Sequence, residues 1–192
     1  MRPRHALPVV VGALLAAGCT SPEPTVQPAS SVTAAHDVQV SETFQRGAGT
    51  AITYDEQLVP AGARGAVRSR SGQGTTTVML AVRGVQPNRT YGAHIHTQPC
   101  GELPDDAGPH FQYSPDPVQP SVDPTFANSQ NEMWLDIATD ETGAGSTETT
   151  VTWTFPDDRR PKSVVVHADG TASEPGQAGT AGGRVACISV DF

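Results

Sequence analysis

Residues 77–83 read Thr-Val-Met-Leu-Ala-Val-Arg, with a large apolar side chain at every second position. Residues 132–137 and 150–155 alternate in a similar way. A period of two is typical of a strand that turns one face to the core and the other to solvent. Since no window of eleven residues carries a helical apolar face, we expect the chain to fold mainly into antiparallel strands.

Further runs of β-prone residues are separated by turns rich in glycine, proline and aspartate. They lie at residues 37–45, 50–54, 63–69, 91–97, 163–167 and 184–190. Eight or nine short strands in one domain of this size predict an all-β sandwich or barrel. Two long segments, 98–131 and 168–183, lack alternation and are expected to be functional loops.

The composition excludes several classes of protein. The chain has 192 residues, of which 17% are charged, and its formal net charge is −8. So few charged residues argue against a coiled coil or a charged helical bundle. Because phosphate binding depends on a surplus of Lys and Arg, we expect no nucleic-acid partner.

The first residues have the pattern of an export signal. Arg2 and Arg4 precede an apolar stretch at 6–17, which is too short to span a bilayer and typical of a secretory signal. The stretch runs into Leu15-Ala16-Ala17-Gly18-Cys19, which resembles a bacterial lipobox. We therefore expect residues 1–18 to be a lipoprotein signal peptide, and Cys19 to carry a lipid that anchors the exported protein to the outer face of the bacterial cell membrane. The alternative is an ordinary signal peptide that leaves Cys19 as a free thiol.

The rest of the chain divides into a spacer and a domain. Residues 19–35 are rich in Ser, Thr and Pro and predict a flexible spacer. Residues 36–192 are expected to form the folded domain.

Four histidines suit a metal site. Residues i and i+2 of a strand point to the same face, so His94 and His96 are expected to project side by side. His110 in a loop and His167 at the end of an apolar strand could complete a set of four imidazoles. Such a set suits copper in tetragonal geometry or zinc in tetrahedral geometry. The alternative for any one of them is an ordinary surface or core histidine.

The cysteines number three, an odd count that a lipidated Cys19 would explain. Cys100 and Cys187 remain, without the spacing of a metal-binding pair. In an exported protein such a pair predicts one structural disulfide.

Five segments, in this order, resemble the copper-zinc superoxide dismutase family over about residues 49–190. They are Gly92-Ala93-His94-Ile95-His96, Cys100, Gly108-Pro109-His110-Phe111, Val164-Val165-Val166-His167 and Gly182-Gly183-Arg184-Val185-Ala186-Cys187. The resemblance implies a Greek-key β-sandwich or barrel of about eight antiparallel strands, in agreement with the alternation.

The resemblance also implies roles for single residues. One copper ion would be held by His94, His96, His110 and His167, and the family's disulfide would join Cys100 to Cys187. Arg184 would line the copper channel and hold superoxide, the anionic substrate. His110 would carry a proton to the bound peroxide. The oligomeric state stays open, with a homodimer as one option.

The chain departs from zinc-containing members, in which two more histidines and an aspartate bind zinc. No histidine lies between His110 and Met133, and the family's Gly-Asp is replaced by Asn131-Glu132-Met133. Asp116 or Asp123 alone cannot build a tetrahedral zinc site. We therefore expect the protein to bind no zinc. In this respect the sequence resembles the copper-only branch of the family.

These features predict a lipid-anchored enzyme that dismutates superoxide at the cell surface. The competing hypothesis is a non-catalytic lipoprotein that binds or sequesters copper on the same fold. The missing zinc site favours that hypothesis, whereas Arg184, which copper binding alone does not require, disfavours it.

Overall fold

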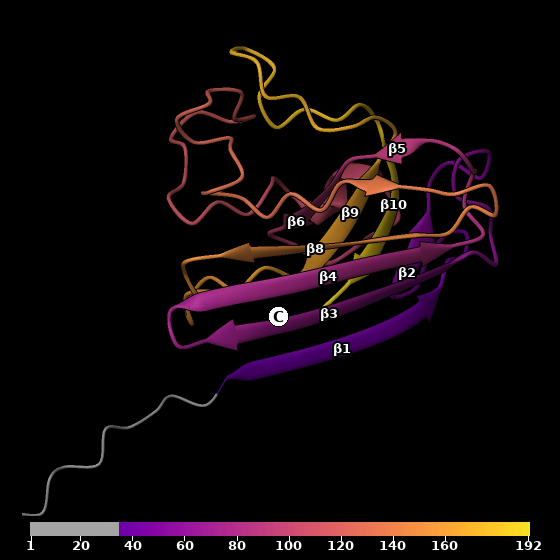
Figure 1. The fold of residues 1–192 in the computed structure, drawn as a ribbon, viewed down its shortest axis with the longest axis horizontal. Helices are drawn as coiled ribbons and strands as arrows, with labels where there is room; N and C mark the ends of the chain where they lie inside the picture. Colours follow the sequence, from indigo (N-terminus) through magenta and orange to yellow (C-terminus); the bar gives the residue numbers. More distant parts are fainter. Residues whose placement is uncertain (1–34) are drawn as a thin grey trace, which may run out of the picture. The chain divides into compact units, whose positions relative to one another are not determined.

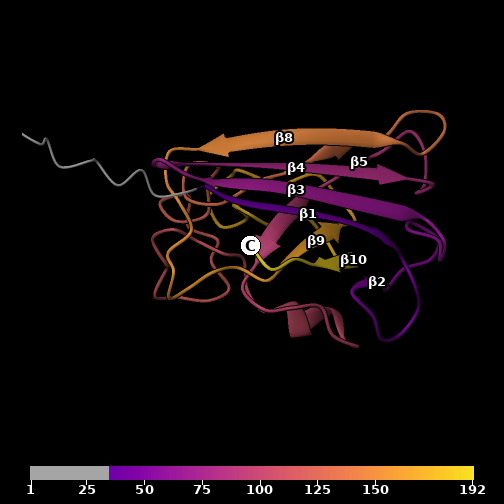
Figure 2. The same cartoon turned by 90° about the horizontal axis from the view of Figure 1, so that it is seen from below.

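Two four-stranded antiparallel sheets pack face to face around the hydrophobic core (Figures 1 and 2). The computed structural model describes residues 35–192; the expected signal peptide, the expected lipidation site Cys19 and nearly all of the expected spacer lie outside the described residues. The first sheet has the strand order β1-β3-β4-β8, the second has the order β2-β10-β9-β6, and β5 pairs with β7 in a short ribbon. The strands are β1 (His36–Thr43), β2 (Ala51–Thr53), β3 (Arg64–Gly72), β4 (Thr75–Arg83), β5 (Thr90–Tyr91), β6 (Ala93–His96), β7 (Ile137–Ala138), β8 (Gly145–Val151), β9 (Ser163–His167) and β10 (Arg184–Ser189).

The apolar side chains of the predicted alternation pack between the two sheets. Along β4, Val78, Leu80 and Val82 are buried while the side chains between them are partly exposed. Ile95 of β6 and Val164 of β9 approach from the second sheet and belong to the same core cluster. Connections that cross between the sheets make sequentially distant strands neighbours, as in Greek-key sandwiches. The prediction of an all-β fold is confirmed.

The second sheet also uses its outer face. Because successive side chains of a strand point to opposite faces, burial of Ile95 in the core turns His94 and His96 outward. Burial of Val164 and Val166 likewise turns His167 outward at the end of β9. The candidate metal ligands therefore lie outside the core and under the long loops.

Some segments differ from their predicted form. The alternation predicts a strand over residues 132–137, yet of these only Ile137 lies in one, although Met133 and Leu135 are buried as the alternation requires. Trp153 and Phe155 are buried beyond the end of β8, in irregular chain. Most of β8 was not predicted because this edge strand carries Ser, Thr and Glu until Val151 and so has no apolar period. The loop 98–131 contains a 3-10 helix at Pro104–Ala107.

Within residues 35–192, no helix reaches the length and apolar character that crossing a bilayer requires.

Candidate metal centre

Four imidazoles converge on the outer face of the second sheet. His94 and His96 come from β6, His167 ends β9, and His110 is brought in from the loop by a bridge to His96. One ring nitrogen of each histidine lies within 4.8 Å of the others. His94 and His96 are fully buried, His167 nearly so, and His110 is partly exposed. The structure thus brings together all four histidines that the sequence singled out.

Each histidine uses one ring nitrogen in a hydrogen bond to the protein. His94 Nε2 lies 2.8 Å from Thr171 Oγ1, and His96 Nδ1 lies 2.9 Å from the carbonyl oxygen of Gly108. His110 Nδ1 lies 3.0 Å from Glu132 Oε2, and His167 Nδ1 lies 3.3 Å from the carbonyl oxygen of Gly182. Because carbonyl and carboxylate oxygens accept, these contacts fix the tautomers of three rings.

The opposite nitrogens are left for a ligand. His94 Nδ1, His96 Nε2 and His167 Nε2 are buried and have no hydrogen-bond partner among residues 35–192. A buried polar atom without a partner is costly, so three such atoms facing one point need an explanation. A metal ion coordinated by four neutral imidazoles supplies it, and the donor set suits copper or zinc.

The environment keeps these imidazoles neutral, the form that binds metal. Burial lowers the pKa of His94 and His96 well below the usual value, and neighbouring His110 lowers both further. The pKa of His167 falls to about 3, again mainly through burial.

We expect the metal-free protein to lose stability as the pH falls from about 6.5 toward 3. In this window the unfolded chain protonates His167 while the folded protein does not, so protons favour the unfolded state. The free energy of unfolding should decrease by about 1.4 kcal/mol per pH unit for this histidine alone. Urea unfolding of metal-free protein at pH 7 and pH 5 measures the slope, and equal stabilities at the two values would contradict the prediction.

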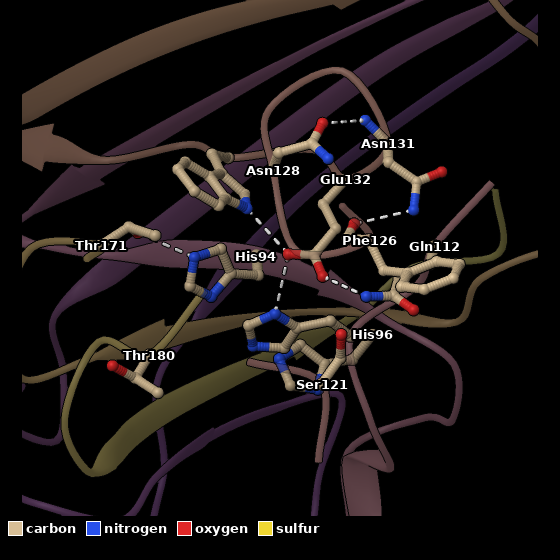
Figure 3. A network of polar contacts seen from close by, with 12 residues as sticks. His94, His96, Gln112, Ser121, Phe126, Asn128, Asn131, Glu132, Thr171 and Thr180 are labelled. Carbon is tan, nitrogen blue, oxygen red and sulfur yellow. Dashed lines mark hydrogen bonds and ion pairs between the residues drawn. The ribbon is translucent and has the colours of Figure 1, made fainter. Parts of the chain in front are cut away.

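Glu132 is a site residue whose role sequence reasoning missed (Figure 3). Its side chain is 1% exposed, and its carboxylate accepts hydrogen bonds from His110 Nδ1, Trp134 Nε1 and Gln112 Nε2. The departure from the family's Gly-Asp at this point was visible in the sequence, but its contact with His110 was not. Glu132 thus provides the partner that orients the His110 ring.

A second carboxylate reaches His94 through a hydroxyl. The Thr171 hydroxyl donates to Asp136 Oδ1 at 2.5 Å. The oxygen of the same hydroxyl accepts from His94 Nε2 (Figure 3). Asp136 Oδ2 also accepts from the backbone N–H of Thr171. This chain ties loop 168–183 to a candidate ligand, and it leaves His94 Nδ1 free for metal.

Arg184 stands at the entrance of the site. A β-bulge at the start of β10 sets Arg184 directly opposite His167. The guanidinium donates to the carbonyl oxygen of Pro104 at 3.0 Å and lies 3.8 Å from Asp105 Oδ1. Partial burial lowers its pKa, but an arginine remains charged at neutral pH.

An open cavity of about 600 Å³ connects the site to solvent. Its lining includes His110, His167 and Arg184, together with segments of both long loops. Those loops touch where the N–H of Gly176 donates to the carbonyl oxygen of Val122. Both segments predicted to be functional loops therefore frame the site.

The predicted disulfide between Cys100 and Cys187 is present. It ties the start of the long loop to β10, beside a small apolar cluster that contains Ala107 and Val165. Tyr54 supports the same loop, because its hydroxyl donates to the carbonyl oxygen of Gly101.

Fold and site together define a β-sandwich metalloprotein with an all-imidazole centre outside its core. The family model for copper/zinc superoxide dismutase (SODC) matches residues 63–190. The chain belongs to this family, whose members bind copper.

A solved structure, the Cu/Zn superoxide dismutase from Brucella abortus, is similar in fold. It is 19% identical in sequence, with a TM-score of 0.51 over 82% of this chain and 100% of that chain. A comparison with curated proteins gave no match.

Proposed function

We propose that this protein is a copper-only superoxide dismutase, exported and anchored by a lipid on Cys19 to the outer face of the bacterial cell membrane. One copper ion would be held by His94, His96, His110 and His167. The observation that carries the proposal is the set of three buried, unpartnered imidazole nitrogens beside a cavity that also contains Arg184. Family membership supports the reaction.

The hydrogen bond made by the second ring nitrogen of His110 supports the proposal that the protein binds no zinc. In zinc-containing members this nitrogen faces zinc, whereas here His110 Nδ1 donates to Glu132. The two aspartates that could have contributed to a zinc site also have other partners. Asp116 accepts from the Val118 N–H and the Ser121 hydroxyl, and Asp123 accepts from the Thr125 N–H.

The protein's contribution to catalysis is to hold ligands and charge in place. When bound, copper supplies one-electron chemistry, by which one superoxide is oxidised to oxygen and a second, with two protons, is reduced to hydrogen peroxide. Arg184 offers the cation that attracts and orients superoxide, which the overall negative charge of the chain repels. His110 is partly exposed and lines the cavity, so its Nε2, when not bound to copper, could exchange a proton with substrate while Nδ1 stays on Glu132.

The competing function is copper sequestration without catalysis. Asp105 favours it, because a carboxylate 3.8 Å from Arg184 offsets the positive field that would attract superoxide. The guanidinium still lines the cavity, and a copper store does not need a cation there.

Metal content and rate test the proposed function together. Purified protein loaded with copper and zinc in excess and then freed of loose metal should retain about one copper and no stoichiometric zinc. The copper-loaded protein should dismutate superoxide. Stoichiometric zinc would overturn the copper-only assignment, and full copper occupancy without dismutation would favour sequestration.

Arg184 and Asp105 give opposite expected effects on the rate. Arg184→Ala should lower kcat/KM by about tenfold, because it removes the local attraction for an anion, while copper stays bound. Asp105→Asn should raise kcat/KM, and both effects should shrink as salt is added. Pulse-radiolysis rates and copper content measure them, and an unchanged rate for Arg184→Ala would exclude Arg184 from the mechanism.

A further inference from the structure

The outer face of the first sheet carries a group of exposed arginines. Arg64, Arg68 and Arg70 project from β3 and Arg83 from β4, and we call these four residues the arginine face. The register of the two strands places Arg64 directly opposite Arg83. Like charges in this relation destabilise a sheet, so the arrangement needs an explanation outside the fold.

The arginine face differs from the protein's other cations in its lack of partners. The six basic side chains elsewhere in residues 35–192 each contact an acidic side chain or a backbone carbonyl. They are Arg46 with Glu56, Arg89 with Ala168, Arg159 with Gln112, Arg160 with Asp157, Lys162 with Asp191, and Arg184 with Pro104. On the arginine face, Arg70 alone reaches a carboxylate, that of Asp37 at 3.7 Å. Arg64, Arg68 and Arg83 have no side-chain hydrogen bond or ion pair within the described part of the chain.

Charge is also segregated between this face and the rest of the domain. The face has two acidic side chains, Asp37 and Glu148, against four arginines, with Asp140 near Arg83. The remainder of residues 35–192 has seventeen acidic and six basic side chains. Arg68 and Arg70 border a groove of about 460 Å³ whose lining also includes Met79 and both acidic side chains of this face, Asp37 and Glu148. Because Arg70 is paired with Asp37, the guanidinium groups left to meet a phosphate are those of Arg64, Arg68 and Arg83.

We propose that the arginine face docks on an anionic phospholipid surface. Its free guanidinium groups match phosphate headgroups in charge and hydrogen bonding. The chain also enters the domain on this sheet, at the edge strand β1. Ala35 is sixteen positions after Cys19, a length of chain that reaches at most about 55 Å when extended and about 22 Å on average for a random coil. A lipid on Cys19 would therefore hold the arginine face within reach of the bilayer.

Docking in this orientation has a consequence for the metal centre. Figure 2 shows β1, β3, β4 and β8 on one side of the sandwich and β9 and β10 on the other. The candidate ligands lie on the outer face of the second sheet, as their alternation with core residues requires. With the arginine face on lipid, the site points away from the membrane and from its negative charge.

Vesicle binding of an unlipidated protein tests the proposal separately from the anchor and from catalysis. The chain from residue 19, carrying Cys19→Ser, is mixed with vesicles of phosphatidylglycerol and phosphatidylcholine (1:1) or of phosphatidylcholine alone, and bound protein is measured by sedimentation. We expect binding to the anionic vesicles at low salt, and its loss at 0.5 M salt. A triple variant should lower the partition coefficient by about 100-fold, since each basic residue contributes roughly fivefold. It carries Arg64→Gln, Arg68→Gln and Arg83→Gln.

Two matched variants complete the experiment. Arg46→Gln, Arg160→Gln and Lys162→Gln remove the same charge from other surfaces and should change the partition coefficient less than threefold. Arg64→Lys, Arg68→Lys and Arg83→Lys keep the charge and should retain binding, with thermal unfolding as the check on folding. The proposal fails if the parent protein does not bind anionic vesicles at low salt. It also fails if both glutamine variants lose binding equally, or if the protein binds heparin or DNA but not vesicles.

Discussion

Replacing Glu132 by glutamine is expected to lower copper affinity, or the rate of the copper-loaded protein, by about 10- to 100-fold. The reason lies in the three side-chain donors that surround this buried carboxylate. Two donate to Oε2 and one to Oε1, and none of them can accept from an amide in these contacts. Glutamine has one oxygen and one NH₂ group, so the NH₂ group must face at least one donor. His110 then loses its orienting partner, or Gln112 and the adjoining loop must move.

Three measurements test this effect: copper affinity by chelator competition, the Cu(II) electron paramagnetic resonance spectrum, and the dismutation rate. Glu141→Gln is the matched control, because it makes the same charge change at an exposed position. Normal affinity, spectrum and rate in Glu132→Gln would show that Glu132 does not orient His110.

Removal of the Cys100–Cys187 disulfide should cost about 4 to 5 kcal/mol of folding free energy in the chain-entropy model. The bond closes a ring that covers most of the domain, and such a loss approaches the whole stability of many domains. Function should suffer as well, because the loop that the bond ties to β10 supplies the Pro104 carbonyl that holds Arg184.

The variant of choice is Cys100→Ala with Cys187→Ala. Cys187 is fully buried in an apolar cluster, so alanine avoids the unpaired hydroxyl that serine would introduce there. Urea unfolding of the variant, the parent and the parent with reductant gives the free energies. A loss below about 1 kcal/mol would mean that the disulfide constrains the unfolded chain far less than expected.

The fold was predictable from the sequence wherever one face of a strand is apolar. Val78, Leu80 and Val82 show this period in β4, and all three are buried. β8 has no apolar period. This polar edge strand is held in the sheet by its backbone pairing with β4 and not by burial of its own side chains. The opposite case is Trp153 and Phe155, where a strand was predicted and irregular chain is found. Both side chains are buried, so the apolar alternation continues past the end of β8 although the backbone pairing does not.

The candidate site was predictable to the level of its four histidines and Arg184. The residues that orient the ligands were not, because their contacts join distant positions. Thr171 lies 77 positions from His94, and Glu132 lies 22 positions from His110. Neither pair has a spacing that a strand or a turn would impose. Such contacts depend on where the long loops cross the sheet, which local patterns do not encode.

The separation of core and ligands onto opposite faces of the second sheet bears on how the protein matures. Ile95, Val164 and Val166 drive assembly of the sandwich on the inner face, and no imidazole of the metal centre takes part in that packing. We therefore expect folding and disulfide formation to precede copper acquisition. Copper would then enter as the last component through the open cavity, and the copper supply, rather than the yield of folded chain, would set the amount of copper-loaded protein.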